Sequence, residues 1–318
     1  MHERTGDKVA IIGAGNVGIR YAYALMIEGV ARKILVVDSN RMRAEGEVMD
    51  LSHGAPYISP VEIQVGDYPD LAGSDLVVVT AGKKQLPGQT RLDLAKGNIE
   101  LYRTIIPEIV RYAPDAHILV VSNPVDILSY AAYKFSGKPL GTIIGSGTVL
   151  DSARFRFSLA THCGIDSRNV HAYILGEHGD SEFAVWSKAM IGGVLFKDYC
   201  YICRNKCGVS DQESEKIFQE VRDSAYKIIE RKQETSYGIG LALVRITKAI
   251  LHDENAILPV SYLVSGYLGV QDVYLSLPAV VNRKGVREVL NIELDEKEQK
   301  QFINSAEIVK TALKAVGL

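Results

Sequence analysis

The sequence has little of what marks secreted, membrane-bound or nucleic-acid-binding proteins. Its four cysteines in 318 residues are unevenly placed and make no disulfide framework. No apolar run approaches the roughly 20 residues of a membrane span, and residues 1–8 are polar where a secretion signal would be apolar. A net charge of −2, with a pI near 6.4, gives no basic surface for nucleic acid or an anionic membrane. We therefore expect a cytoplasmic protein with neither a membrane nor a nucleic-acid partner.

What the sequence does contain is an alternation of short apolar runs with helix-like segments. The apolar runs are rich in β-branched residues and end in polar or glycine turns, at Lys8–Ile12, Lys33–Asp38, Leu76–Thr80 and His117–Ser122. Val17–Gly29 has the pattern of a helix. Continuous apolar strands separated by helices predict a parallel sheet that is buried on both faces. A chain of 318 residues is also long enough for two domains.

The pattern changes after about residue 142. Longer helical stretches and a candidate β-hairpin follow, at Ser152–Cys163, Asp211–Arg231 and Val273–Val281. We place the domain boundary between Gly141 and Gly147, which predicts one domain over residues 1–145 and a second over residues 146–318. The expected fold class is α/β, with a doubly wound parallel sheet followed by a second domain that mixes helices and strands.

The segment GAGNVG begins at Gly13, directly after the first apolar run. It fits the pattern G-x-G-x-x-G, in which Gly13 allows a tight turn, Gly15 lets the backbone approach a pyrophosphate and Gly18 lets a helix pack closely on a strand. Asn16 and Val17 would begin that helix, whose free N–H groups attract an anion. The segment predicts a dinucleotide site, and the alternative is a glycine turn without a ligand.

Acidic and polar residues at later strand ends support the dinucleotide site. Asp38 ends the second strand 20 residues after Gly18, where an acid accepts hydrogen bonds from a ribose diol and repels a 2′-phosphate. The alternative for Asp38 is a loop cap. Gly82 and Asn123 follow later strands, and ligands bind at the carboxyl ends of such strands. We therefore expect one NAD site that collects Gly13, Asp38, Gly82 and Asn123.

The segment ILGEHGD places His178 between glycines, which leave its ring accessible. Hydride transfer to a ketone leaves negative charge on oxygen, so a proton donor with a pKa near neutrality is useful. Asp151 is the candidate carboxylate that would fix the ring tautomer. Arg154 suits a carboxylate, and Arg91, in a loop rich in glycine and proline, suits a carbonyl. The alternatives are a structural histidine and an arginine paired on a helix surface.

These motifs together resemble the lactate/malate dehydrogenase family almost from end to end. They occur in family order and at family spacing as GAGNVG, VVD, TAG…PGQTRLDL, SNPVDI, GTVLDSARFR, LGEHGDS and ETSYGIG. The resemblance implies a Rossmann-type NAD domain followed by an α/β substrate domain. It also implies the activity of the family's L-lactate dehydrogenases, the reversible reduction of pyruvate with NADH. In that reaction His178 would be the acid/base and Asp151 its partner.

The resemblance assigns further roles residue by residue. Arg154 becomes the bidentate clamp on the substrate carboxylate, and Asn123 a hydrogen-bonding group near the reacting oxygen. Arg91 becomes the loop arginine that polarises the carbonyl group. Thr235 lines the substrate pocket, and Ile239 packs on the nicotinamide.

Gln85 bears on the choice of substrate. Malate-specific members of the family carry arginine at the matching position, which pairs with the second carboxylate of oxaloacetate. A neutral amide leaves that charge poorly compensated in a closed site, so pyruvate is favoured and malate dehydrogenase is the alternative. One departure from the family's lactate dehydrogenases is Gln89, where they usually have glutamate. An alternative of another class is a catalytically silent NAD-binding redox sensor, which would be expected to lack His178, Asp151 or Arg154.

Three of the cysteines form C-x-x-C-x-x-x-C at Cys200, Cys203 and Cys207, a spacing that could hold zinc with a fourth ligand from elsewhere. No histidine lies in that segment, so we expect free thiols and no metal.

Arg156 and His171 lie near the catalytic residues in the sequence but outside their register. His171 is seven residues before His178, an odd offset, so on one strand the two side chains would point to opposite faces. In allosterically activated bacterial members of the family, the matching pair binds fructose 1,6-bisphosphate at a two-fold interface. The resemblance therefore implies this effector and a homotetramer; the alternative is an interface salt bridge or a buried polar pair.

Overall fold

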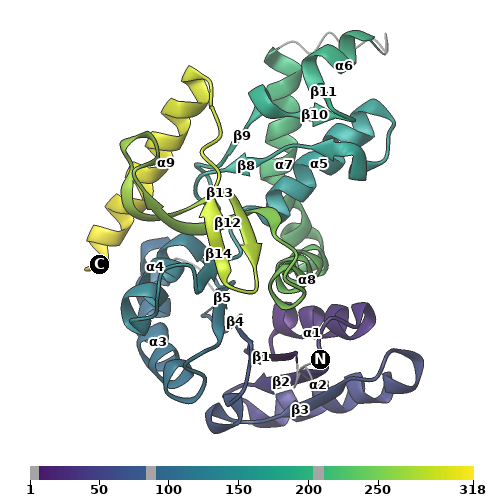
Figure 1. Cartoon of the computed structure of the whole chain (residues 1–318), viewed down its shortest axis with the longest axis vertical. Coiled ribbons are helices and arrows are strands. Elements are labelled where there is room, and N and C mark those ends of the chain that lie inside the picture. Colours follow the sequence, from purple (N-terminus) through teal and green to yellow (C-terminus); the bar gives the residue numbers. More distant parts are fainter. Residues whose placement is uncertain (1–6, 84–90, 203–210) are drawn as a thin grey trace.

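The computed structural model describes residues 7–83, 91–202 and 211–318. Its main element is a nine-stranded sheet with the order β14-β13-β12-β6-β5-β4-β1-β2-β3 (Figure 1). The parallel part has the doubly wound order 3-2-1-4-5-6. Its strands are β1 (Lys8–Ile12), β2 (Lys33–Val37), β3 (Glu62–Val65), β4 (Leu76–Val79), β5 (His117–Val120) and β6 (Ile143–Gly145). The four strands that the apolar runs predict are present within one or two residues.

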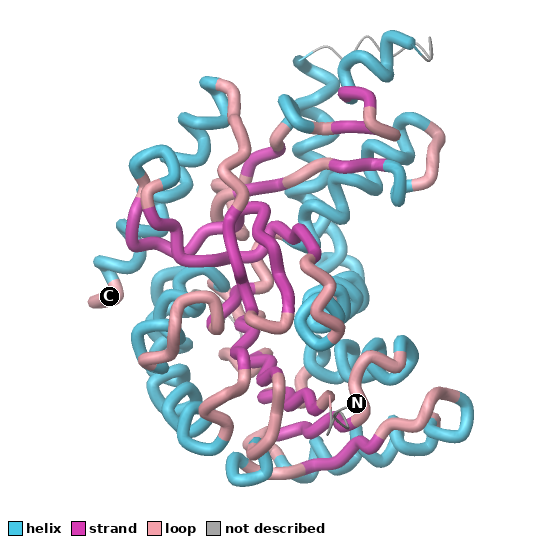
Figure 2. The backbone as a smooth tube through the Cα atoms, in the orientation of Figure 1, coloured by secondary structure: helices cyan, strands magenta, loops and turns pink. Residues whose placement is uncertain are grey.

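Helices cover both faces of the parallel strands because successive residues of a strand point to opposite faces. On β1, Val9 and Ile11 pack with α1 (Asn16–Glu28), α2 (Arg41–His53) and α8 (Tyr237–Leu251), whereas Ala10 and Ile12 pack with α3 (Arg91–Tyr112) and α4 (Val125–Ser136). All four of these strand residues are buried, so the sheet is the centre of two apolar layers. Figure 2 shows the helices on either side of the strands.

The sheet continues into three antiparallel strands, β12 (Ala256–Ser265), β13 (Gln271–Asn282) and β14 (Gly285–Val289). The link to the parallel part is the pair Ser261 and Gly145. The predicted hairpin at residues 273–281 is wrong, because these residues lie within the single strand β13. Ser276 and Pro278, which look like turn residues, pair with Ser261 and Pro259 of β12. The turns lie outside, at each end of β13.

The rest of the chain forms smaller elements beside this sheet (Figure 1). One small sheet joins β7 (Val170–His171), β10 (Met190–Ile191) and β11 (Val194–Leu195), and another joins β8 (Ile174–Leu175) to β9 (Phe183–Ala184). The remaining helices are α5 (Val149–Cys163), α6 (Phe196–Ile202), α7 (Asp211–Lys232) and α9 (Glu296–Ala315). Of the helices in the described part, none has the length and apolar character that crossing a membrane requires.

Candidate active site

The glycine turn, residues 13–18, joins β1 to α1 at the carboxyl edge of the parallel strands. Gly13 has a φ of +115°, and a Cβ there would lie 2.8 Å from the backbone nitrogen of Ala81. A Cβ on Gly18 would lie 2.0 Å from the carbonyl oxygen of Gly13. A Cβ on Gly15 would meet no protein atom within 4 Å. Gly15 is also the N-cap of α1, and no side chain there accepts a hydrogen bond from the first N–H groups of the helix. The turn therefore leaves room and donors for a pyrophosphate.

Asp38 lies just after β2 and holds the glycine turn in place. Its Oδ2 accepts a hydrogen bond of 2.6 Å from the N–H of Ala14, and its Oδ1 accepts one of 2.7 Å from the N–H of Asn40. Asn16, at the start of α1, accepts a bond of 3.4 Å from Arg43 of α2. Burial is only partial at Asp38, so its carboxylate can still reach a ribose diol. A partly exposed carboxylate beside a glycine turn is the arrangement that a dinucleotide site requires.

Gly82 and Asn123 are brought together by a residue that the sequence did not single out. Asn98 of α3 is 1% exposed; its Oδ1 accepts from the N–H of Lys83 at 2.7 Å, and its Nδ2 donates to the carbonyl oxygen of Asn123 at 2.8 Å. A Cβ on Gly82 would lie 3.1 Å from Cβ of Ser122. One buried amide thus fixes the ends of two loops at the sheet edge.

His178 and Asp151 meet although 27 residues separate them. Nδ1 of His178 lies 2.6 Å from Oδ2 of Asp151, and Nη1 of Arg154 donates to Oδ1 of the same carboxylate at 2.7 Å. The Asp151 side chain is 3% exposed, whereas 28% of the His178 side chain is exposed. The carboxylate therefore orients the ring, and Nε2 is the nitrogen left for chemistry.

Short polar side chains anchor α5, which carries Asp151, to β8. The hydroxyl of Thr148 donates to the carbonyl oxygen of Ile174, and Oγ of Ser152 accepts from the N–H of Ile174 at 2.9 Å. Oγ of Ser276 accepts from the N–H of Thr148 at 3.1 Å. The first turn of α5 is therefore fixed to the strand that leads to His178.

The turn after β8 is held from two further helices. The N–H of His178 donates to Oδ2 of Asp126 on α4 at 2.8 Å, and the N–H of Glu177 donates to Oγ of Ser305 on α9 at 2.7 Å. Asp126 also accepts a hydrogen bond from the hydroxyl of Ser261. The position of the His178 ring thus depends on side chains from α4, α5 and α9.

Electrostatics favour a protonated His178 ring. Burial lowers the pKa of His178, but the charge of Asp151 and the hydrogen bond to it outweigh burial and raise this pKa to about 9. Burial would raise the pKa of Asp151, yet the charges of His178 and Arg154 hold it below its usual value. Burial raises the pKa of Asp126 to about 7, against the hydrogen bonds from Ser261 and His178.

A third buried carboxyl group, that of Glu182, lies beside His178 and Asp151. Burial and then the charge of Asp151 raise the pKa of Glu182 well above its usual value. We call Asp126, Asp151, Arg154, His178 and Glu182 the His178 cluster. The sequence pointed to three of the five; the signals for the others are an acid in the apolar run VDIL and an acid next to the apolar pair Phe183–Ala184.

Thr235 and Ile239 are two further predicted residues that the structure describes. Thr235 is half-buried in the loop between α7 and α8. Ile239, on α8, packs against the same apolar cluster as Ala14 and Val17 of the glycine turn. This packing is close, because a Cβ on Gly240 would lie 3.2 Å from the carbonyl oxygen of Arg20 in α1.

Several predicted residues lie outside the described part of the chain. These are Gln85, Gln89, Cys203 and Cys207, together with the side chains of Arg91 and Cys200. The backbone of Arg91 begins α3.

Arg156 and His171 lie on neighbouring elements, α5 and β7. Nη2 of Arg156 donates to the carbonyl oxygen of Ser167 at 3.3 Å, while its buried Nε has no partner among the described residues. His171 is exposed. The argument from a single strand is wrong, because His171 ends β7 and His178 follows β8, which belongs to another sheet. The separation of the two histidines comes from this topology.

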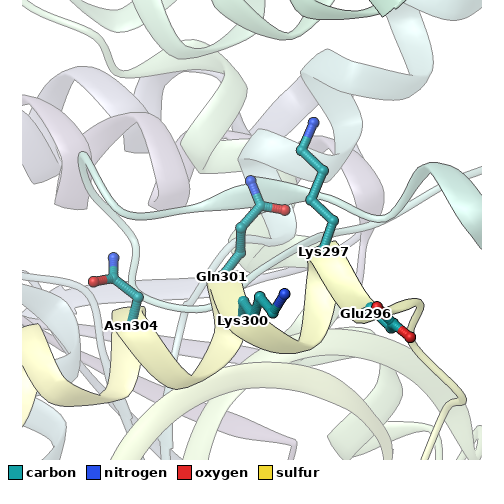
Figure 3. Close-up of a pocket in the computed structure, with 5 residues that line it drawn as sticks. All are labelled: Glu296, Lys297, Lys300, Gln301 and Asn304. Atoms are coloured by element: carbon teal, nitrogen blue, oxygen red, sulfur yellow. The ribbon is translucent and has the colours of Figure 1, made fainter.

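A shallow depression on α9 carries no predicted residue. Figure 3 shows its lining along one helix, made of Glu296, Lys297, Lys300, Gln301 and Asn304. The candidate site is instead the edge where the glycine turn and the His178 cluster lie.

Comparison with known proteins agrees with this arrangement. Residues 7–145 match the model of the lactate/malate dehydrogenase NAD-binding domain, and residues 148–317 match that of the α/β C-terminal domain. The chain is 47% identical over 312 residues to an L-lactate dehydrogenase of Thermoanaerobacter sp. (strain X514), covering 98% of this chain and 100% of that protein. It is 48% identical over 313 residues to L-lactate dehydrogenase 1 of Clostridium acetobutylicum, covering 98% and 99%.

Two crystal structures are also similar. A lactate dehydrogenase from a Medee basin deep-sea metagenome library superposes with a TM-score of 0.94 at 45% identity, covering 98% of this chain and 99% of that chain. The minor L-lactate dehydrogenase of Enterococcus mundtii, in a ligand-bound form, superposes with a TM-score of 0.95 at 40% identity, covering 99% and 100%.

Proposed function

This chain belongs to the lactate/malate dehydrogenase family, and on that premise we propose that it interconverts pyruvate and L-lactate: pyruvate + NADH + H⁺ ⇌ L-lactate + NAD⁺. Relatives of nearly equal length that carry the name L-lactate dehydrogenase support the proposal. The observation that carries it is the contact of 2.6 Å between Nδ1 of His178 and Asp151, with Arg154 on the same carboxylate. An oriented acid and a guanidinium suit a substrate with a carbonyl and a carboxylate.

The cofactor is NAD, because residues 7–145 match the NAD-binding domain of the family. Gly13, Gly15 and Gly18 would hold its pyrophosphate, and Asp38 its ribose diol. Gly82, Asn123 and Ile239 would border the nicotinamide. NADH, when bound, supplies a hydride to the carbonyl carbon of pyruvate.

The chain's own residues would handle charge and the proton. His178 donates its Nε2 proton to the carbonyl oxygen, so that an N–H bond breaks and an O–H bond forms, while Asp151 stabilises the imidazolium beforehand. Arg154 gives one edge of its guanidinium to Asp151, and we assign its other edge to the substrate carboxylate. Arg91 would polarise the carbonyl, and Thr235 would line the pocket beside the methyl group.

The neutral side chain of Gln85 favours pyruvate over oxaloacetate. Steady-state kcat/KM values for both keto acids test this preference, and a higher value for oxaloacetate would make the protein a malate dehydrogenase instead. The variant Gln85→Arg should move the preference toward oxaloacetate. NADH oxidation by the purified protein with several keto acids is the first assay, because no turnover with any of them would leave the silent NAD-binding sensor.

We propose a homotetramer as the working assembly. Large apolar side chains are exposed on α1, α2 and α8, at Tyr23, Ile27, Met42, Met49, Tyr237 and Leu241. These helices lie on the same side of the parallel strands (Figure 1). Exposed apolar side chains gathered on one side suit an interface between copies of the chain. Sedimentation velocity of the purified protein would measure the assembly directly, and a monomer would contradict it.

We propose fructose 1,6-bisphosphate as an activator bound by Arg156 and His171. The half-buried guanidinium of Arg156 and the exposed ring of His171 are donors suited to phosphate when the ring is protonated. An effector that binds only the assembled state stabilises it by mass action, and its coupling to substrate affinity is reciprocal. Pyruvate saturation curves with and without millimolar effector test this; the effector should lower KM, less so at high pH and not at all in Arg156→Gln. Superimposed curves for the wild type would leave both residues structural.

A further inference from the structure

Glu182 stands out because it is a buried acid beside the His178–Asp151 pair. It lies four residues after His178, where its N–H donates to the carbonyl oxygen of Gly179 at 3.2 Å and closes the turn between β8 and β9. Its residue exposure is 7%. Burial makes a carboxyl group costly to ionise, so the charges around Glu182 decide its own charge.

Those surroundings are the His178–Asp151 pair. One carboxylate oxygen of Glu182, one of Asp151 and a ring nitrogen of His178 lie within 4.8 Å of one another. Such a triad could coordinate a divalent cation, but Arg154 donates to Asp151 at 2.7 Å and already supplies positive charge there. Arg154 and a protonated His178 ring therefore supply the positive charge that faces the two carboxyl groups.

The charged groups that act on Glu182 and His178 come from four directions. Asp151 and Arg154 face Glu182 from α5, His178 from the same turn, and Arg222 from α7. His178 is influenced first by Asp151, then by Glu182, and then by Asp126 of α4. Negative charge on Glu182 therefore raises the pKa of His178, and positive charge on His178 lowers the pKa of Glu182.

We propose that Glu182 is a positioning residue for the reaction's proton: its carboxyl group, once ionised at alkaline pH, keeps His178 protonated and extends the pH range of pyruvate reduction. Asp151 fixes the orientation of the ring, and Glu182 adjusts how firmly the ring holds its proton. The proposal rests on the function proposed above, since it requires His178 to be the proton donor.

The test is the alkaline limb of kcat/KM for pyruvate. Only the protonated ring can donate, so the rate should fall as pH rises through the His178 pKa, raised to about 9. In Glu182→Gln the midpoint of that fall should move to lower pH by about 0.6 unit, the Coulomb term for charges about 5 Å apart at a water-like dielectric constant, and further at a lower one. Glu182→Asp, which keeps the charge, should restore most of the wild-type midpoint.

The matched control is Glu177→Gln, which removes the same charge one residue before His178. The hydroxyl of Ser181 donates to the Glu177 carboxylate, and Glu177 is outside the group of three within 4.8 Å. Its midpoint should stay within about 0.2 unit of the wild type. A neutral residue of similar volume, Glu182→Met, should shift the midpoint as the glutamine does and serves if Glu182→Gln does not fold.

A second readout needs no turnover. Oxamate, the amide analogue of pyruvate that accepts no hydride, should bind the enzyme–NADH complex only while His178 is protonated, so its Kd should rise at the same pH as kcat/KM falls. Equal alkaline midpoints in wild type and Glu182→Gln, in both measurements, would overturn the role of Glu182 alone. A wild type that reduces no keto acid at any pH would overturn the proposed function instead.

Discussion

The glycine turn and the His178 cluster lie at the same end of the parallel strands but are built differently. The turn acts within six residues, through the shape of a backbone that carries no Cβ at Gly13, Gly15 and Gly18. The cluster gathers side chains from α4, α5 and the turn between β8 and β9; all five are ionisable, and Asp126, Asp151 and Glu182 are buried. The turn would be disturbed by added volume, whereas the cluster would be disturbed by removing a hydrogen-bond partner or a charge.

The largest effect is expected from His178→Asn, because the ring is the proposed proton donor. Turnover of pyruvate should fall by about 10³-fold or more, within the usual range for losing a general acid together with its charge. NADH binding should remain near the wild-type level, since the ring belongs to the cluster and not to the glycine turn. Fluorescence titration with NADH beside steady-state rates checks both, and a matched loss of NADH affinity would mean that the two regions are not separate.

Asp126→Leu tests the cluster through stability. The carboxylate accepts hydrogen bonds from the N–H of His178 and the hydroxyl of Ser261, and leucine leaves both donors buried and unpaired. Each such donor costs about 1–3 kcal/mol, so for two donors we expect a loss of about 2–6 kcal/mol in the free energy of unfolding. Urea unfolding measures it. Asp126→Asn, which keeps an acceptor for His178, is the control, and an equal loss in both variants would show that charge rather than pairing matters.

Gly18→Ala tests the glycine turn through volume. The added Cβ would lie 2.0 Å from the carbonyl oxygen of Gly13, so α1 must move away from β1. Overpacking of this kind costs about 1–3 kcal/mol in unfolding free energy. Gly15→Ala is the contrast, because its Cβ meets no protein atom within 4 Å; it should unfold like the wild type yet bind NADH more weakly. A destabilised Gly15→Ala would contradict the open space assigned to the pyrophosphate.

Local features of the sequence were sufficient for the parallel strands and the glycine turn. Val9 to Ile12 and Leu76 to Val79 are apolar at every position, which is the mark of strands buried on both faces. The prediction of a hairpin at residues 273–281 was wrong because local features were misleading there. Ser276 and Pro278 look like turn residues, but Ser276 exchanges backbone hydrogen bonds with Gly176, which is far away in the chain. Propensity was overridden there by pairing that no local window contains.

The cluster was predictable only in part. Chemistry and family resemblance pointed to His178 and Asp151, and the structure brings them to 2.6 Å, while their roles stay predictions. Asp126, Asn98 and Glu182 were missed, because an acid or an amide in an apolar segment signals a buried partner without saying which one. Their partners lie on other elements, such as the N–H of His178 for Asp126 and the carbonyl oxygen of Asn123 for Asn98. Only the fold supplies these pairings.

The smallest effect is expected from Asp38→Ala. At this position the glycine turn resembles the His178 cluster, because a charged side chain supports the backbone of the turn. Its carboxylate accepts from Ala14 at 2.6 Å and from Asn40 at 2.7 Å, so alanine loosens the turn and removes the acceptor for the ribose diol. We expect the Kd of NADH to rise about tenfold, or about 1.4 kcal/mol. The affinity for NADPH should fall much less, because the repulsion of its 2′-phosphate disappears and Arg43 lies nearby, hydrogen-bonded to Asn16 at 3.4 Å.

The control is Asp38→Asn, which keeps an acceptor for Ala14 without the charge. Comparing the NADH and NADPH affinities of the two variants separates support of the turn from charge repulsion. An NADH preference over NADPH that stays at the wild-type value in both variants would place the cofactor discrimination outside Asp38.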